Sequence, residues 1–258
     1  MRALLPLAVF FAFAARMASA GDPVTQTTGY DNVHIRVSDP AKAVAWYVKT
    51  LGGTSPAAGQ VYFGSALIAV VKTNQPQPSA GSAIDHIGLS YPDIAAKMKE
   101  AESAGARVLS PPREIPGVLK FAFIEDPWGV KIELVEDSEL LGFHHVHLSV
   151  KDPAATLAWF QQMFGGERQK LKGRIDGLRY GGVWLFAAAS QDQTPAPSFD
   201  RAIMSLGLRV PDIHKSTAEL VQRGVKFPVE PRALGDLWYA FAEDPNGVRV
   251  ELLQRPPQ

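Results

Sequence analysis

The sequence predicts an α+β fold made of four modules, each of which is a strand, a helix and then three more strands. Three observations predict it: the two halves of the chain resemble each other, each half divides again, and the strand segments alternate apolar and polar residues. With 258 residues, 46% hydrophobic and 20% charged, the chain has ample apolar material for a packed core and is not disordered.

The two halves begin and end alike. The segment Asn32 to Pro40 returns as His145 to Pro153, and Ala122 to Leu134 returns as Ala240 to Leu252. A few loop insertions explain the small difference between the two offsets. The chain is therefore a tandem duplication, and we place the join near residues 137–142.

Each half contains a second, smaller repeat. A strand that begins at Ile84 in the first half is mirrored by one that begins at Ile203 in the second. We therefore predict an N-terminal domain over residues 21–139 and a C-terminal domain over 140–258, with two modules in each.

The opening strands of the first and third modules lead into helices. Asp39-Pro40 and Asp152-Pro153 supply a capping carboxylate and a proline suited to the first helical turn. Apolar residues then follow at helical spacing and stop at Gly52-Gly53 and Gly165-Gly166, where glycine suits the left-handed end of a helix.

Strand patterns follow each helix, and polar connections separate the modules. The stretches that alternate or run apolar are Val61 to Val71, Val118 to Glu136, Val183 to Ala189 and Leu237 to Leu253. Thr73 to Gly81 and Gln191 to Ser198 are rich in Pro, Gln, Ser and Thr, so we expect exposed connections there.

One face of the opening and closing strands carries titratable side chains, because alternate residues of a strand point to opposite faces. This polar face includes His34, His86, His147, Glu133 and Glu251. A sheet with one face in water would also show polar residues, but three of the six histidines share one strand position. Two imidazoles and one carboxylate form a three-ligand set that leaves metal positions open, so we predict a metal site.

Composition excludes several functions. There is no cysteine, which excludes disulfides, thiolate metal ligands and a thiolate nucleophile. Basic and acidic residues balance at 26 each and no basic cluster is present, so we expect no nucleic-acid partner.

Residues 1–20 have the layout of a secretory signal peptide. Arg2 precedes the uncharged, mostly apolar run Ala3 to Ala15, and Ala18-Ser19-Ala20 ends it with small residues. The apolar run is about 13 residues, short of the roughly 20 that span a bilayer. We expect cleavage after Ala20 and a periplasmic or secreted protein with no membrane association after cleavage.

The repeated modules, the opening-strand histidines and the segment Asp126 to Glu133 resemble the vicinal oxygen chelate superfamily, which includes glyoxalase I, bleomycin and fosfomycin resistance proteins and extradiol dioxygenases. The resemblance covers about residues 30–254. It implies that paired modules curl into two incomplete barrels, with helices packed outside curved mixed sheets. It also implies metal ligands on the first strand of each module and the last strand of the second.

The resemblance leaves two ligand sets open, because modules of this superfamily pair either within a half or across the halves. Pairing within the half gives His34, His86 and Glu133, whereas pairing across the halves replaces His34 by His147. We favour pairing within the half.

The second half lacks a complete set on the same pattern. It offers His147, Ser205 and Glu251, and serine is a poor substitute for a histidine ligand. The resemblance thus implies one divalent metal ion per chain, either Fe, Mn, Zn, Co or Ni. His145 shares the face of His147 and is an alternative to it as a ligand, but we favour its interpretation as a spare polar residue.

The family resemblance implies a metal-dependent enzyme that acts on a small oxygenated molecule, with dioxygenase or isomerase/lyase-like chemistry. The alternative is a non-catalytic binding protein of the bleomycin-resistance type. Arg36 and Ser90 lie on the polar face and are expected to contact the substrate. A chain of four modules needs no partner to complete a cavity, so a monomer is expected.

The patterns of two members of this superfamily fit only in part. Glyoxalase I implies a fourth ligand, an acid or amide, on the last strand of the first module, but residues 65–71 contain none. Extradiol dioxygenases imply a tyrosine where Phe123 stands and an upstream histidine that residues 113–120 lack. The sequence therefore assigns no general acid or base.

Overall fold

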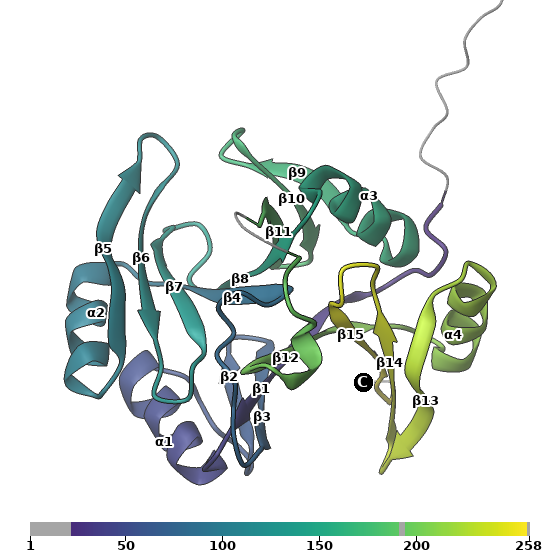
Figure 1. The fold of residues 1–258 in the computed structure, drawn as a ribbon, viewed down its shortest axis with the longest axis horizontal. Helices are drawn as coiled ribbons and strands as arrows, with labels where there is room; N and C mark the ends of the chain where they lie inside the picture. Colours follow the sequence, from purple (N-terminus) through teal and green to yellow (C-terminus); the bar gives the residue numbers. More distant parts are fainter. Residues whose placement is uncertain (1–21, 191–193, 257–258) are drawn as a thin grey trace, which may run out of the picture.

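The computed structural model describes residues 22–190 and 194–256, so the expected signal peptide lies outside the described residues. The described residues form four α-helices and two mixed sheets of seven and eight strands (Figure 1). Within the described part, no helix is long and apolar enough to cross a membrane.

The first half follows the predicted order of elements. Its first module comprises β1 (Gly29–Val37), α1 (Pro40–Leu51), β2 (Gln60–Phe63) and β3 (Ala66–Lys72). Its second module comprises β4 (Ile84–Ser90), α2 (Ile94–Ser103), β5 (Arg107–Ile115), β6 (Leu119–Glu125) and β7 (Lys131–Glu136). In the first module, the earliest of the three expected later strands is reduced to a single bridge between Thr54 and Tyr62.

The second half repeats this order. Its third module comprises β8 (Gly142–Val150), α3 (Pro153–Phe164), β9 (Glu167–Leu171), β10 (Ile175–Tyr180) and β11 (Val183–Ala189). A short 3-10 helix, η1 (Ser198–Asp200), leads to the fourth module, with β12 (Ile203–Arg209), α4 (Ile213–Gln222), β13 (Lys226–Leu234), β14 (Leu237–Glu243) and β15 (Arg249–Gln254).

The predicted helix starts are confirmed. The side chains of Asp39 and Asp152 accept hydrogen bonds from the backbone N–H groups of Lys42 and Ala155, with a proline at the start of each helix. Gly52 ends α1 in the left-handed conformation at φ 78°, where a side chain would be strained.

The sheets pair modules across the halves, so the favoured pairing within a half is wrong. The seven-stranded sheet has the order β13-β14-β15-β12-β1-β3-β2, and the eight-stranded sheet has the order β5-β6-β7-β4-β8-β11-β10-β9. The first module therefore shares a sheet with the fourth, which we call the 1/4 barrel, and the second shares a sheet with the third, the 2/3 barrel. The physical reason is that β1 and β4 each carry their own parallel closing strand on one edge, and the other edge bonds to β12 or β8.

Modules of the same half still contact each other, but through helices and turns. Helices α1 and α2 lie side by side in Figure 1. The Tyr47 hydroxyl of α1 donates a 2.8 Å hydrogen bond to Asp126 of the second module. In the second half, Asn246 of the fourth module donates to Thr156 of α3 at 3.1 Å.

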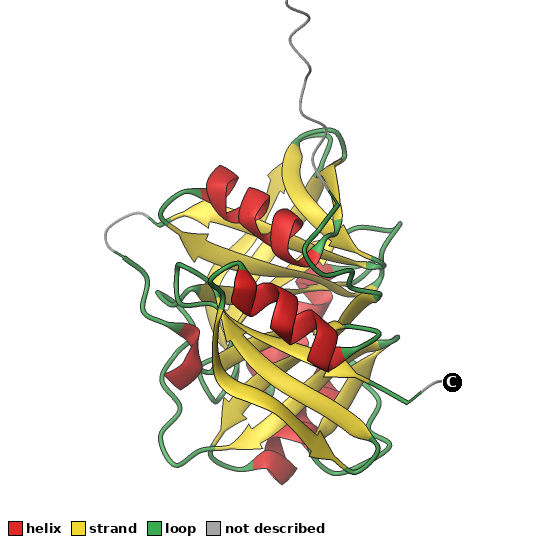
Figure 2. Cartoon of the chain, turned by 90° about the vertical axis from the view of Figure 1, so that its right-hand side faces the viewer, coloured by secondary structure: helices red, strands yellow, loops and turns green. Residues whose placement is uncertain are grey.

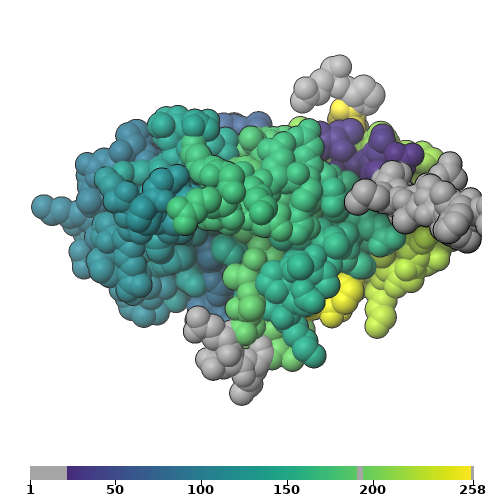
Figure 3. Space-filling model, turned by 90° about the horizontal axis from the view of Figure 1, so that it is seen from above, coloured from purple at the N-terminus to yellow at the C-terminus, as the bar shows by residue number. Residues whose placement is uncertain are grey.

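The core lies between the helices and the apolar faces of the sheets, and Figure 2 shows the helices lying over the strands. The polar face is also covered: Asn32, His86, His145 and Glu251 are each 5% exposed or less. The polar face is therefore the interior of each barrel and is not a solvent-facing side. The two halves of the chain form one continuous body in the space-filling view (Figure 3).

Candidate metal centre

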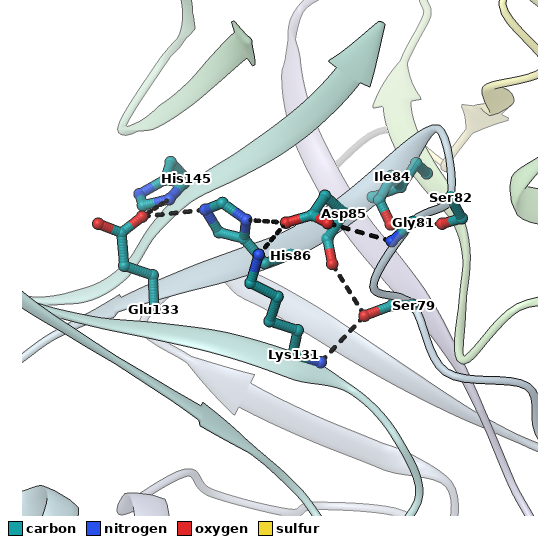
Figure 4. A network of polar contacts seen from close by, with 9 residues as sticks. All are labelled: Ser79, Gly81, Ser82, Ile84, Asp85, His86, Lys131, Glu133 and His145. Carbon is teal, nitrogen blue, oxygen red and sulfur yellow. Dashed lines mark hydrogen bonds and ion pairs between the residues drawn. The ribbon is translucent and has the colours of Figure 1, made fainter. Parts of the chain in front are cut away.

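The strand register of the 2/3 barrel brings four side chains together. Strand β4 lies between β7 and β8, with His86 opposite His147 and Gly88 between His145 and Glu133. One ligand atom from each of His86, Glu133, His145 and His147 lies within 4.8 Å of the others. Figure 4 shows three of these residues converging from their separate strands.

The carboxylate of Glu133 is the centre of this cluster. Its Oε2 atom lies 2.9 Å from Nε2 of His86 and 3.1 Å from Nε2 of His145. The His145 nitrogen is buried and lacks the alignment of a hydrogen bond, so it has no such partner among the described residues. A buried nitrogen aimed at a carboxylate without a hydrogen bond is the arrangement expected of two ligands of one cation.

Gly88 makes room for the ring of His145. A Cβ atom at this position would lie 2.1 Å from both Cε1 and Nδ1 of His145. No side chain larger than hydrogen fits there while the ring keeps its place. The glycine therefore belongs to the site, although it offers no ligand atom.

A carboxylate orients His86 from behind. Nδ1 of His86 lies 2.7 Å from Oδ2 of Asp85, which also pairs with the ammonium group of Lys131 (Figure 4). Such carboxylate–histidine contacts fix the ring and the tautomer of metal-binding histidines.

Two further contacts hold the ring of His145 in place. Its Nδ1 lies 2.8 Å from Nδ1 of His144, and Nε2 of His144 lies 3.3 Å from Oδ2 of Asp137. His144 is fully buried. These contacts hold the His145 ring from the side opposite Glu133.

Three of the four side chains have protonation states in the free protein that suit metal binding. Burial raises the pKa of Glu133, but its contacts with His145 and His86 outweigh burial and hold its pKa well below 4.5. Burial lowers the pKa of His145 and of His147, so both rings are neutral. Burial also lowers the pKa of His86, but Asp85 and Glu133 outweigh it and raise the pKa above 6.5, so a metal ion has to displace a proton from this ring.

The four side chains fit a divalent transition metal. Imidazole and carboxylate donors suit Zn, Fe, Mn, Co or Ni, and Asp85 adds the outer contact that such sites usually have. His86, His147 and Glu133 would form the three-ligand set, and His145 offers a fourth nitrogen.

The favoured ligand set with His34 is not brought together. His34 lies in the 1/4 barrel, opposite Ser205, with its Nε2 atom 3.6 Å from Oε2 of Glu251. The physical reason is the sheet order, which places β1 and β4 in different sheets. The set with His147, His86 and Glu133, left open from the sequence, is the one that the structure assembles.

The sequence interpretation of His145 as a spare polar residue is not supported, because its ring belongs to the cluster. The unused signal is the glycine at the facing position of β4.

The two residues expected to contact a substrate have structural partners. Arg36 donates to the Phe199 carbonyl at 2.9 Å and to Asp200 at 3.0 Å in the 1/4 barrel. The Ser90 hydroxyl donates to the Asp137 carbonyl at 3.0 Å and is buried. Neither residue lines the cavity beside His86.

A polar cavity of about 740 Å³ adjoins the cluster. His86 and His147 line it together with Asp85, Lys131 and Arg201. The ring of Phe186 lies 5.3 Å from that of His145 and 6.0 Å from that of His147, and it belongs to a buried apolar cluster with Val118, Leu171 and Trp184. The cavity gives a molecule access to His86 and His147 beside the two cationic residues.

The fold and this cluster define a class of protein: paired βαβββ modules with a histidine and glutamate site inside a barrel. The model of the Glyoxalase/Bleomycin resistance protein/Dioxygenase superfamily matches residues 29–134 and 142–252. The chain belongs to this superfamily. No curated protein sequence matches the chain.

Solved structures share the fold at low sequence identity. Glyoxalase I from Zea mays gives a TM-score of 0.70 at 18% identity, over 88% of this chain and 92% of that chain. A mutant of the same enzyme gives 0.73 at 17% identity, over 88% and 93%. A candidate dioxygenase from Bacillus subtilis gives 0.64 at 17% identity, over 90% and 87%. These likenesses are evidence for the fold alone.

Proposed function

We propose that this protein is a metal-dependent enzyme that acts on a small anionic molecule with two neighbouring oxygen atoms. The observation that carries the proposal is the convergence of His86, His147 and Glu133, with His145, beside a polar cavity. A divalent metal held there would act as a Lewis acid toward adjacent substrate oxygens.

The walls of the cavity support an anionic substrate. Lys131 and Arg201 contribute two positive charges against one carboxylate, Asp85, which is already engaged with His86 and Lys131. Arg201 would hold a substrate carboxylate, while Asp85 keeps His86 oriented.

The residue opposite His147 argues against the glyoxalase reaction and for dioxygenase or isomerase-like chemistry. With modules paired across the halves, the last strand that would bear the fourth acid or amide ligand of glyoxalase I is β11. Phe186 stands opposite His147 there, and residues 183–189 contain no acid or amide. The fourth donor of this chain would instead be His145, from the same strand as His147.

We also propose that the protein is exported, since residues 1–20 have the layout of a signal peptide. Export would separate the enzyme from cytoplasmic thiols, so we propose a thiol-independent reaction. N-terminal sequencing of the protein recovered from outside the cytoplasm tests this; a chain that starts at Gly21 is the expected result, and retention of Met1 would contradict export.

Metal content of the purified chain tests the site. We expect about one divalent metal per chain by elemental mass spectrometry, and at least a tenfold loss of affinity in His147→Ala. His34→Ala is the matched control because His34 occupies the same strand position in the 1/4 barrel, and it should retain the metal. Loss of metal in His34→Ala but not in His147→Ala would overturn this assignment.

Turnover separates an enzyme from a binding protein. The metal-loaded chain should convert at least one member of a panel of catechol carboxylates, 2-hydroxy ketones and 2-keto acids, and Arg201→Ala should raise KM at least tenfold for the anionic members. Tight, metal-independent binding of these compounds without turnover would favour a sequestering protein instead.

A further inference from the structure

The 1/4 barrel contains a second cavity of different character. It has a volume of about 350 Å³. Its walls are mostly apolar, with Leu67, Leu237, Tyr239, Phe241 and Leu253 among them. Its polar lining includes Asn32, His34, Glu251 and Arg255.

This cavity is open because small residues stand where the 2/3 barrel has aromatic rings. Ala69 of β3 lies opposite His34, whereas Phe186 of β11 lies opposite His147. Likewise Leu67 lies opposite Asn32, whereas Trp184 lies opposite His145. The two rings that fill one barrel are thus missing from the other, and space remains above the polar end.

The polar end lacks the ligand set of the metal centre. Ser205 faces His34 in the register where His86 faces His147. Asn32 takes the place of His145, and its Nδ2 atom donates to Oε2 of Glu251 at 2.8 Å. One imidazole, one carboxyl, one amide and one hydroxyl form a poor transition-metal site but a good set of hydrogen-bonding groups.

Several of these polar atoms lack partners. Among the described residues, Oδ1 of Asn32, Nδ1 of His34 and Oγ of Ser205 are buried and make no hydrogen bond. Asn32 is 1% exposed and Ser205 is fully buried. Leaving a buried polar group unpaired is unfavourable, so a bound molecule that pairs with Asn32 and His34 would be stabilised.

The polar end carries little charge below pH 7, and the one cation that lines the cavity, Arg255, is paired with a carboxylate. Burial raises the pKa of Glu251 to about 7 and lowers the pKa of His34 to about 4. The neighbouring carboxylate of Asp31 is paired with Arg255 at 2.7 Å and also with Arg209. An uncharged ligand therefore suits the cavity better than an ion.

We propose that the 1/4 barrel is a metal-free binding site for one small, uncharged molecule with an apolar ring and a hydroxyl or carbonyl group. The ring would lie against Phe241 and Leu253, and the oxygen would pair with His34 and Asn32. This site is separate from the proposed metal centre and does not depend on it.

The test uses 4-methylphenol as the probe and toluene as its analogue without the hydroxyl group. Calorimetric titration of the full, metal-loaded chain should give saturable binding of one 4-methylphenol per chain, with toluene at least tenfold weaker. Ala69→Phe copies the residue that fills the other barrel, and it should weaken 4-methylphenol binding at least tenfold. His86→Ala should leave this binding unchanged.

Methyl NMR makes the test independent of the variants. Addition of 4-methylphenol should shift the methyl signals of Leu67, Val70 and Leu253 and leave those of Val118 and Leu171 in place. The proposal is overturned by shifts confined to Val118 and Leu171, by equal affinity for toluene, by the absence of saturable binding, or by a second bound metal per chain.

Discussion

At the scale of single residues, Gly88 is the position in the candidate site where a substitution has the clearest expected effect on metal binding. Gly88→Ala would place a Cβ atom 2.1 Å from the ring of His145, so the ring must move away from Glu133. We expect metal affinity to fall at least tenfold, measured by competition with a chromophoric chelator.

The second barrel supplies the control for this change. Gly207→Ala is equivalent in register, and its Cβ would meet the amide of Asn32 at 2.6 Å. It should cost about 1–3 kcal/mol of stability and leave metal affinity unchanged. Equal loss of metal in both variants would show that Gly88 acts only through general stability.

Glu251 should impose its own pH dependence on stability. Because burial raises its pKa to about 7 from 4.5, the native state binds more protons than the unfolded state between these values. Its contribution is therefore fully present below pH 4.5 and is lost as the pH rises through 7.

The variant Glu251→Gln isolates this contribution. Between pH 4 and pH 8, the unfolding free energy of the parent relative to the variant should fall by about 3 kcal/mol. Urea denaturation with a chelator present measures this, since Asp31, Arg255 and His34 are common to both proteins. A difference that is flat or rises with pH would contradict the proposed protonation state.

The sequence predicts most residues of the site but does not predict which residues they contact. His86, His147 and Glu133 are visible as polar positions on alternating strands, and the resemblance names them as possible ligands. The ring of His145 enters the cluster because Gly88 faces it on the neighbouring strand. That contact depends on register, which the sequence of one strand does not contain.

At the scale of elements, a hydrogen bond from α1 supports the turn that leads into the ligand strand β7. Asp126 accepts from the backbone N–H groups of Trp128 and Val130, each at 2.8 Å, and from the hydroxyl of Tyr47. Tyr47→Phe leaves this buried carboxylate without one donor. We expect a loss of about 1–2 kcal/mol in thermal or urea unfolding.

Tyr30→Phe is the matched control for Tyr47→Phe. The Tyr30 hydroxyl is buried and makes no hydrogen bond with any described residue. Its removal should leave stability unchanged or raise it, because an unpaired buried polar group is unfavourable. If the two variants were equally destabilised, the hydrogen bond to Asp126 would not be the cause.

The elements themselves follow closely from the sequence. Asp39 and Asp152 cap helices because a short side chain with an acceptor oxygen can reach the free N–H groups of the first turn. The exception is the first module, where the strand expected before Gln60 is a single bridge at Thr54. The segment from Ser55 to Gly59 lacks the alternation that would extend it.

At the scale of the whole molecule, the local sequence patterns do not determine which modules pair. β1 and β4 have nearly the same alternation as β8 and β12, so each could bond to either candidate. The structure bonds β4 to β8 and β1 to β12, and contacts within each half run through helices and turns. The duplicated halves of the sequence therefore do not correspond to the two barrels.

This arrangement predicts that neither half forms the metal centre alone. A chain of residues 22–139 would keep His86 and Glu133 but lose His145 and His147, and it would expose the edges of β1 and β4. We expect it to aggregate or self-associate in light scattering, because unpaired strand edges and uncovered apolar faces favour association. It should bind divalent metal at least a hundredfold more weakly than the full chain.

Producing the two halves together should restore the metal centre. Residues 22–139 and 140–258, produced together as separate chains, should form a one-to-one complex that regains one metal, because both barrels need strands from each half. His147→Ala in the second chain should abolish the regained binding, and His34→Ala in the first should not. A monomeric first half with the metal affinity of the intact protein would mean that the site is built within a half, with His34 as its third ligand after all.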